Sequence, residues 1–328
     1  MNFFKSMLFI GIIFLMVSCS KEENTTNVPF VPSQNALKWE VGYNTFDQEM
    51  GGHLRNFVIH IPSKYDATKA VPLVLMLHGS SGDGDRFYNI SGWTEKADQE
   101  GFIVVFPTGL EYPIAENNGK PGTKWSSDGL INDIVPGTVI IDDVVFIRAL
   151  VEKCKESFFI NAKRVYISGF SNGGAFVRSR IITEMNDVFA AASTGGGFGL
   201  PAKKSVKDNV FMPLYSIAGT KDNKIIDASG TNDDVPFEAE VLMSDPIFRK
   251  QIDGVLQTLN LGNEYKEERV NPKYNIITFD NDLSKQGNEH ILMIVNALEH
   301  NYPTTKNNKH EVNAVDHFWP WFQKFSLK

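Results

Sequence analysis

The chain contains the stretch RVYISGFSNGG at residues 164–174. Its first half is an apolar, β-branched run typical of a buried strand, and its second half holds the pattern G-x-S-x-G around Ser171. A serine at the tip of a tight strand-to-helix turn has a strained backbone, and glycines two residues to either side avoid a collision across that turn. A helix predicted over 175–185 directs amide groups and its positive end toward the site. This context predicts that Ser171 is a nucleophile.

Around this stretch, short apolar runs alternate with helical periods, which is typical of a mostly parallel sheet covered on both faces. Strands are expected at 56–61, 71–77, 102–106, 164–168, 190–193, 214–218, 275–279 and 291–295. Helices are expected at 94–99, from 139 or 140 onward, at 175–185, 249–259 and 312–325. The pattern predicts one α/β domain of three layers, an αβα sandwich, over residues 39–328.

A nucleophilic serine needs a histidine as base, and in this kind of fold the base follows the serine and the acid in the chain. His300 lies in a loop just after the strand predicted at 291–295, where a base can reach the serine. His290 precedes that strand and His310 falls in a polar stretch. His317, in an aromatic C-terminal helix, is the main alternative to His300.

The orienting acid is expected in the loop after the strand at 214–218, which places Asp222 at the same edge of the sheet. Asp227 and Glu299 compete with it. Glu299 adjoins the histidine, and chain neighbours rarely aim side chains at each other. Asp222 is therefore the predicted acid, and its alternative interpretation is a simple turn residue.

The oxyanion donors are expected to be the backbone N–H groups of Ser80 and Asn172. Residues 78–80, HGS, follow the buried strand at 71–77 and fit an HG-type oxyanion loop, in which His78 is structural. Trp125 lies in the long polar loop at 108–136, and loops of that length are usually functional. Trp125 either stacks on a sugar or aromatic acyl group or acts as a hydrophobic plug.

These residues resemble the feruloyl esterase and poly(3-hydroxybutyrate) depolymerase group of carbohydrate esterase family one. The resemblance lies in GGHLR (51–55), PLVLMLHG (72–79), the segment 93–107, IDDVVFI (141–147) and RVYISGFSNGG (164–174). It implies the α/β-hydrolase fold, with a mostly parallel sheet. It also implies Ser171 as nucleophile, Asp222 as acid and His300 as base, in agreement with the assignments above.

The resemblance leaves the substrate open. The group often has cysteine after the HG pair, where this chain has Ser80, and Gly-Gly before the catalytic histidine, where it has Leu298-Glu299. Residues 223–240 also depart from the family pattern. The leading hypothesis is release of feruloyl or acetyl groups from plant cell-wall polysaccharide. The alternatives are polyhydroxyalkanoate (polyhydroxybutyrate) depolymerisation, a related serine peptidase, and a binding lipoprotein that has lost catalysis.

The N-terminal residues predict export. Lys5 and the apolar run at 7–17 read as a signal peptide, too short to span a bilayer stably, and residues 16–19, MVSC, resemble a bacterial lipoprotein signal. That resemblance implies a signal peptide over 1–18, lipidation of Cys19 and a periplasmic or surface-facing protein of the outer membrane. Residues 19–38 are expected to form a flexible tether. An ordinary signal peptide with a chance cysteine is the alternative.

Composition narrows the remaining functions. The net charge of −7 and the absence of a basic patch argue against nucleic acid. No sequence motif indicates a metal or an organic cofactor, so none is expected. Besides Cys19 the chain has only Cys154, on the apolar side of a predicted helix, where we expect a buried, inert thiol. The protein is expected to be a monomer whose only membrane contact is its lipid.

Overall fold

The computed structural model describes residues 30–200, 211–230, 233–280 and 287–327. The predicted signal peptide and Cys19 lie outside these residues. In the described part of the chain, no helix has the length and apolar character needed to cross a membrane.

The centre of the molecule is a ten-stranded sheet. In spatial order its strands are β1 (Gly42–Met50), β2 (His53–Ile61), β4 (Ile103–Pro107), β3 (Val71–Leu77), β7 (Ile160–Phe170), β8 (Ala191–Gly195), β9 (Leu214–Gly219), β12 (Glu289–Val295), β11 (Tyr274–Asp280) and β10 (Lys266–Val270). The six strands from β4 to β12 run parallel, and two antiparallel strands extend the sheet at each side. The carboxyl ends of the parallel strands therefore share one edge.

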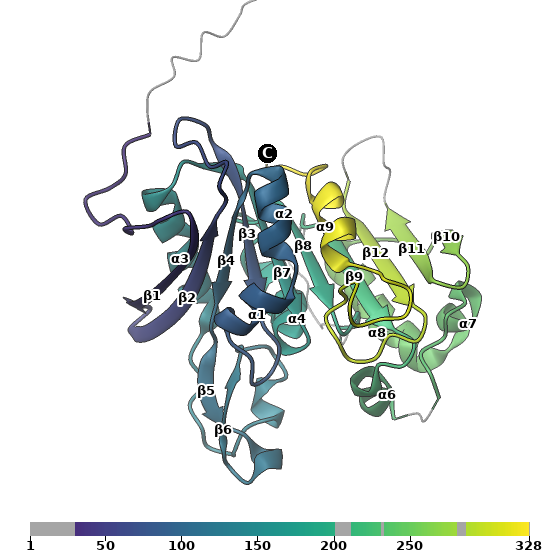
Figure 1. Cartoon of the computed structure of the whole chain (residues 1–328). Helices are drawn as coiled ribbons and strands as arrows, with labels where there is room; N and C mark the ends of the chain where they lie inside the picture. The colour runs from purple at the N-terminus through teal and green to yellow at the C-terminus, as the bar shows by residue number, and fades with distance from the viewer. Residues whose placement is uncertain (1–29, 201–210, 231–232, 281–286, 328) are drawn as a thin grey trace, which may run out of the picture.

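Helices cover both faces of this sheet. In Figure 1, α1 (Gly84–Ile90), α2 (Trp93–Glu100) and α9 (Ala314–Phe322) lie in front of it. The other face carries α3 (Asp143–Ser157), α4 (Asn172–Phe176), a π-helical turn (Val177–Ile181), α5 (Ile182–Glu184), α6 (Asn223–Ser229), α7 (Ala239–Ser244) and α8 (Pro246–Leu259).

The side chains of β3 show why both faces need cover. Leu73, Leu75 and Leu77 enter the core beneath α3 and α4, whereas Val74 and Met76 enter the core beneath α1, α2 and α9. A parallel strand that is apolar on both faces is stable only between two layers of helices. The predicted fold class, a three-layer αβα sandwich of the α/β-hydrolase type, is confirmed.

The long segment at 108–136 is not a structureless loop. It contains a hairpin of β5 (Leu110–Pro113) and β6 (Pro121–Lys124), which projects below the carboxyl edge of the sheet in Figure 1. Two 3₁₀ turns, Ala115–Asn117 and Leu130–Asn132, complete it. The segment has a small apolar core of its own, made by Tyr112, Ile114, Leu130 and Ile134.

The predicted tether is partly ordered against the body. Leu37 is only 6% exposed, and its N–H donates to Ser157 Oγ at 2.9 Å. The N–H of Ser33 donates to the Glu156 carbonyl at 3.0 Å. The prediction of a flexible tether through residue 38 is therefore wrong for its last residues, because Leu37 gains more by burial in the core than it loses in chain freedom.

Candidate active site

Ser171 lies at the turn between β7 and α4. Its backbone has φ 51° and ψ −115°, a conformation that residues other than glycine rarely adopt. A Cβ at Gly169 would lie 2.6 Å from the Gly173 carbonyl oxygen, and a Cβ at Gly173 would lie 2.5 Å from the His78 carbonyl oxygen. Both glycines are thus required by close backbone approach, which holds the serine at the tip of the turn.

His300 and Asp222 meet this serine from two loops at the same edge. His300 Nε2 lies 2.8 Å from Ser171 Oγ, and His300 Nδ1 lies 2.8 Å from Asp222 Oδ1. Asp222 is 1% exposed and caps α6, where its carboxylate accepts the N–H groups of Lys224 and Ile225 at 3.1 and 3.2 Å. With the ring proton on Nδ1, Nε2 is placed to accept the proton of the serine hydroxyl.

The competing residues lie elsewhere. The ring of His317, on α9, packs edge-on against Tyr274 with centroids 5.4 Å apart. His290 is fully buried at the start of β12 and stacks on Phe279. Asp227 falls inside α6, and among the described residues no hydrogen bond joins its carboxylate to His300. Of the candidates weighed from the sequence, the structure brings Ser171 together with the two predicted partners.

The loop after β3 is held by His78. This imidazole is fully buried, its Nδ1 donates to the Gly79 carbonyl at 2.6 Å, and its Nε2 accepts the Gly109 N–H at 2.9 Å. Burial lowers the pKa of His78 to about 4, so the ring is neutral near pH 7. Ser80 and Asn172 border the same cavity as Ser171. As the first residue of α4, Asn172 has an N–H without an acceptor in its own helix.

Trp125 does not face the substrate space. Its side chain has no exposed surface, its Nε1–H donates to the His78 carbonyl at 2.9 Å, and its ring stacks on Phe176. The N–H of Trp125 also donates to Asn172 Oδ1 at 2.7 Å. The interpretation of Trp125 as a stacking platform for substrate is wrong. It is a hydrophobic plug, because the chain after the hairpin turns inward and packs against the loop after β3.

A buried ion pair fixes the base of the hairpin. Arg55 Nη1 lies 2.7 Å from Asp143 Oδ1, and the two side chains are 1% and 0% exposed. Asp143 Oδ2 accepts the Ser126 N–H at 2.8 Å, and Ser126 Oγ accepts the Asp143 N–H at 2.9 Å. Burial raises the pKa of Asp143, an effect that the Arg55 guanidinium opposes. The sequence showed no sign of this pair other than charges within largely apolar segments.

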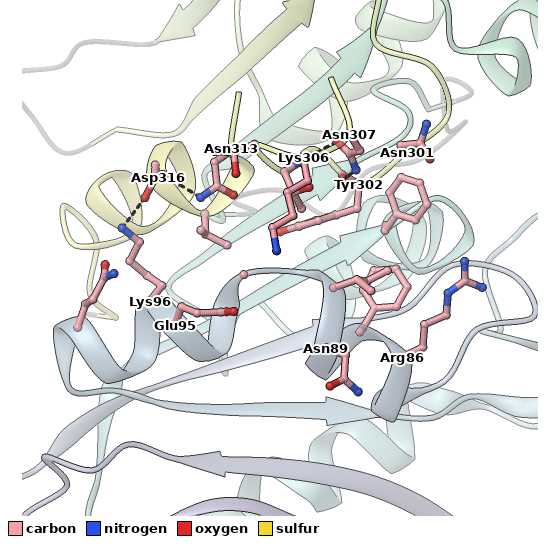
Figure 2. A pocket seen from close by; sticks show the side chains of 18 of the residues that line it. Arg86, Asn89, Glu95, Lys96, Asn301, Tyr302, Lys306, Asn307, Asn313 and Asp316 are labelled. Carbon is pink, nitrogen blue, oxygen red and sulfur yellow. Dashed lines mark hydrogen bonds and ion pairs between the residues drawn. The ribbon is translucent and has the colours of Figure 1, made fainter. Parts of the chain in front are cut away.

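Two cavities meet at His300. One, of about 620 Å³, contains Ser171 and lies between the hairpin, residues 196–199 and α6. The other, of about 660 Å³, lies between α1, α2 and residues 301–316, and Figure 2 shows its amide-rich wall at Asn301, Asn307 and Asn313. His300 and Phe170 border both cavities. In the described part of the chain, no group of three side chains is arranged to hold a metal ion.

The fold and the serine at its strand-to-helix turn define an α/β-hydrolase. The chain belongs to the phospholipase/carboxylesterase family, whose model matches residues 59–232.

Several relatives in sequence are named as ester hydrolases. A poly(3-hydroxyalkanoate) depolymerase C of Paucimonas lemoignei is 31% identical over 59% of this chain and 39% of its own length. A bifunctional acetylxylan esterase/xylanase of Neocallimastix patriciarum is 28% identical over 55% of this chain and 23% of its own length. Feruloyl esterase B of Piromyces equi is 26% identical over 52% of this chain and 30% of its own length. The chain spans less than half the length of each relative.

Among solved structures, an acetyl xylan esterase from Aspergillus awamori superposes with a TM-score of 0.59. The matched region covers 86% of this chain and 99% of the acetyl xylan esterase chain, at 13% sequence identity. At that identity the similarity supports the fold.

Proposed function

We propose that the protein is a serine carboxylic ester hydrolase in which Ser171, His300 and Asp222 form the catalytic triad. The observation that carries this proposal is the pair of 2.8 Å hydrogen bonds that sets the imidazole between the serine hydroxyl and a buried carboxylate. His300 accepts the serine proton as Oγ attacks the ester carbonyl, and Asp222 stabilises the imidazolium. The alcohol leaves with that proton, and water then releases the acid from the acyl-enzyme.

The developing oxyanion is received by the backbone N–H groups of Ser80 and Asn172. Support for this assignment comes from the place of both residues beside Ser171 in one cavity, and from the helix start at Asn172. Each such donor typically lowers the barrier by about 2.7–4 kcal/mol. The mechanism requires no metal or organic cofactor.

The substrate proposed is a feruloyl or acetyl ester of plant cell-wall polysaccharide. Because His300 protonates the departing alcohol, that alcohol lies on the His300 side of the serine. The second cavity begins at His300, and its asparagine and threonine side chains suit the hydroxyl groups of a sugar chain. The names of two relatives support the same class. The runner-up, depolymerisation of polyhydroxyalkanoate, is favoured by the 31% identity with a depolymerase.

The location proposed is outside the inner membrane, with Cys19 carrying a lipid and a monomeric catalytic domain beyond it. The support is the lipoprotein-like sequence at residues 16–19. Metabolic labelling with a radioactive fatty acid tests this, since a Cys19→Ala variant should take up no label. Equal labelling of both forms would reject lipidation at this residue.

The activity is tested by rates on methyl ferulate, acetylated xylan and hydroxybutyrate oligomers, with Ser171→Ala as the blank. Loss of the nucleophile should reduce kcat by about 10⁶-fold, by analogy with its removal in a serine protease. Preference for a plant-derived ester supports the polysaccharide hypothesis, and preference for the oligomers supports the depolymerase. No labelling by a fluorophosphonate probe and no rate above the blank would favour a non-catalytic binding lipoprotein.

A further inference from the structure

Arg178 is a buried cation in the wall of the catalytic cavity. Its side chain is 5% exposed and borders the 620 Å³ cavity that also contains Ser171 and His300. It lies on the π-helical turn that follows α4, and such turns often occur at functional sites because they redirect the side chains they carry. The proposed catalytic steps leave this residue without a role.

The guanidinium has no carboxylate partner in the described part of the chain. Its Nη1 donates to the Gly197 carbonyl at 2.9 Å and its Nε to the Gly199 carbonyl at 3.1 Å. These are the only hydrogen bonds found for its five N–H donors among the described residues. Burial lowers the pKa of Arg178 to about 10, which still leaves it cationic near neutral pH. A buried charge without a counter-ion carries a large desolvation cost.

The loop around the guanidinium is shaped to receive it. A Cβ at Gly197 would lie 2.8 Å from Arg178 Nη2, and a Cβ at Gly174 would lie 3.2 Å from Nη1. The neighbouring Gly196 lies close to the imidazole of His300, since a Cβ at Gly196 would lie 3.0 Å from His300 Cε1. Adjacent Cα atoms are about 3.8 Å apart, so the guanidinium lies within roughly 13 Å of the imidazole. One substrate molecule can contact both.

The charges of the cavity wall favour an anion. Among the described residues, four basic side chains line it, Arg86, Lys124, Arg178 and Lys224, and two acidic ones, Glu116 and Asp133. Lys124 and Asp133 form an ion pair at 2.7 Å, which leaves the wall with a surplus of positive charge. The whole chain has a net charge of −7, so this local surplus runs against the charge of the protein.

We propose that Arg178 binds a carboxylate of the substrate, so that the protein prefers esters carrying a free carboxylate over neutral esters of the same size. Two parallel N–H···O bonds to a planar carboxylate are the interaction for which a guanidinium is best suited. This proposal rests on the esterase function proposed above and specifies its substrate class. The carboxylate can belong to the acyl part or to the alcohol part of the ester, and the test separates the two.

The test compares kcat/KM for matched pairs of esters. For the acyl part, the pairs are 4-nitrophenyl monoesters of adipic, suberic and sebacic acids against 4-nitrophenyl alkanoates of equal chain length. For the alcohol part, the pair is O-acetyl-3-hydroxybutyrate against its methyl ester. We expect a preference of about 10- to 150-fold for the carboxylate in one arm, the range given by about 1.5–3 kcal/mol for a charged hydrogen bond.

Variants then assign the preference to the residue. Arg178→Gln should bring the ratio of carboxylate to neutral ester close to one, and Arg178→Lys should retain part of it because the charge remains. Arg180→Gln is the matched control on the same helical turn, since the Arg180 side chain is paired with Glu184 and does not border the cavity. It should leave the ratio unchanged.

The outcomes separate this proposal from the esterase function. Equal rates on charged and neutral esters by the unmodified protein, or an unchanged ratio in Arg178→Gln, would overturn the carboxylate site while ester hydrolysis itself stands. Hydrolysis of none of the esters would instead reject the esterase function. The comparison within the unmodified protein keeps the proposal testable if Arg178→Gln does not fold, which a thermal unfolding curve would reveal.

Discussion

Replacement of Arg55 by methionine should destabilise the protein in a strongly pH-dependent way. The substitution keeps an unbranched side chain over Phe146, whose ring centroid lies 4.5 Å from the guanidinium carbon in the unmodified protein. It removes the charge that faces Asp143 at 2.7 Å. The carboxylate then remains fully buried, with the Ser126 N–H as a hydrogen-bond donor but without a cation.

Two estimates bound the loss of unfolding free energy in Arg55→Met. Removing one partner of a buried ion pair typically costs about 3–5 kcal/mol. Asp143 can escape that cost by taking up a proton, and protonating a carboxyl with an ordinary pKa of 3.8 costs about 4.4 kcal/mol at pH 7. At pH 5 the same step costs only about 1.6 kcal/mol. The loss of unfolding free energy should therefore be about 3–4 kcal/mol at pH 7 and below about 2 kcal/mol at pH 5.

Urea unfolding at both pH values measures this directly, on the unmodified protein, Arg55→Met, and the double variant Arg55→Met with Asp143→Asn. The asparagine is neutral and keeps an acceptor for the Ser126 N–H, so the double variant should be more stable at pH 7 than Arg55→Met alone. A loss in Arg55→Met below about 1 kcal/mol at pH 7, or an equal loss at both pH values, would refute the reasoning.

Three further predictions concern other buried groups. Asp222→Asn should lower kcat by about 10⁴-fold through the wrong imidazole tautomer, measured on any ester that the unmodified protein cleaves. Burial lowers the pKa of His78 to about 4 and of His290 to about 3, below the unfolded value of 6.5. The neutral rings therefore stabilise the fold above pH 6.5, and unfolding free energy should fall by about 1.4 kcal/mol per pH unit for each histidine as pH drops toward 4. His290→Gln should reduce that slope in urea titrations, and an unchanged slope would contradict the assignment. Burial raises the pKa of Cys154 to about 12, so a thiol reagent at pH 8 should modify it only in denaturant.

The sequence predicted best those elements whose side chains are buried on both sides. The strand expected at 71–77 has the bounds of β3, because a run of seven apolar residues is typical of a parallel strand buried on both faces. The sequence does not reveal the two edge strands. β1, GYNTFDQEM, alternates between half-buried and exposed positions, and β10, KEERV, is almost wholly exposed. Neither carries a continuous apolar signal. The β5–β6 hairpin was missed because Pro113, Pro121 and Gly122 are typical of loops.

The residues of the candidate site likewise divide into those that a sequence pattern locates and those that it does not. Ser171, Asp222 and His300 could be proposed because each follows a recognisable strand, so that the topology alone brings them to one edge. The sequence does not distinguish Arg178, because nothing in a helical sequence shows that its side chain borders a cavity. The sequence leaves the direction of the Trp125 side chain open for the same reason. A side chain in a loop can face solvent or core, and only the packing around it decides.

The β5–β6 hairpin can vary in sequence beyond its base without losing its attachment to the rest of the domain. Its base is fastened by the hydrogen bonds of Trp125 and Ser126, and by the Ser81 N–H, which donates to the Thr123 carbonyl at 2.9 Å. Tyr112 and Ile114 of the hairpin pack with Leu130 and Ile134 in an apolar cluster separate from the three larger cores. Substitutions beyond the base therefore reshape one wall of the cavity that contains Ser171, while the loop after β3 keeps its supports. Within the hairpin, Glu116 and Asn117 are exposed and border this cavity, so substitutions there can change substrate preference without disturbing the buried Tyr112 and Ile114.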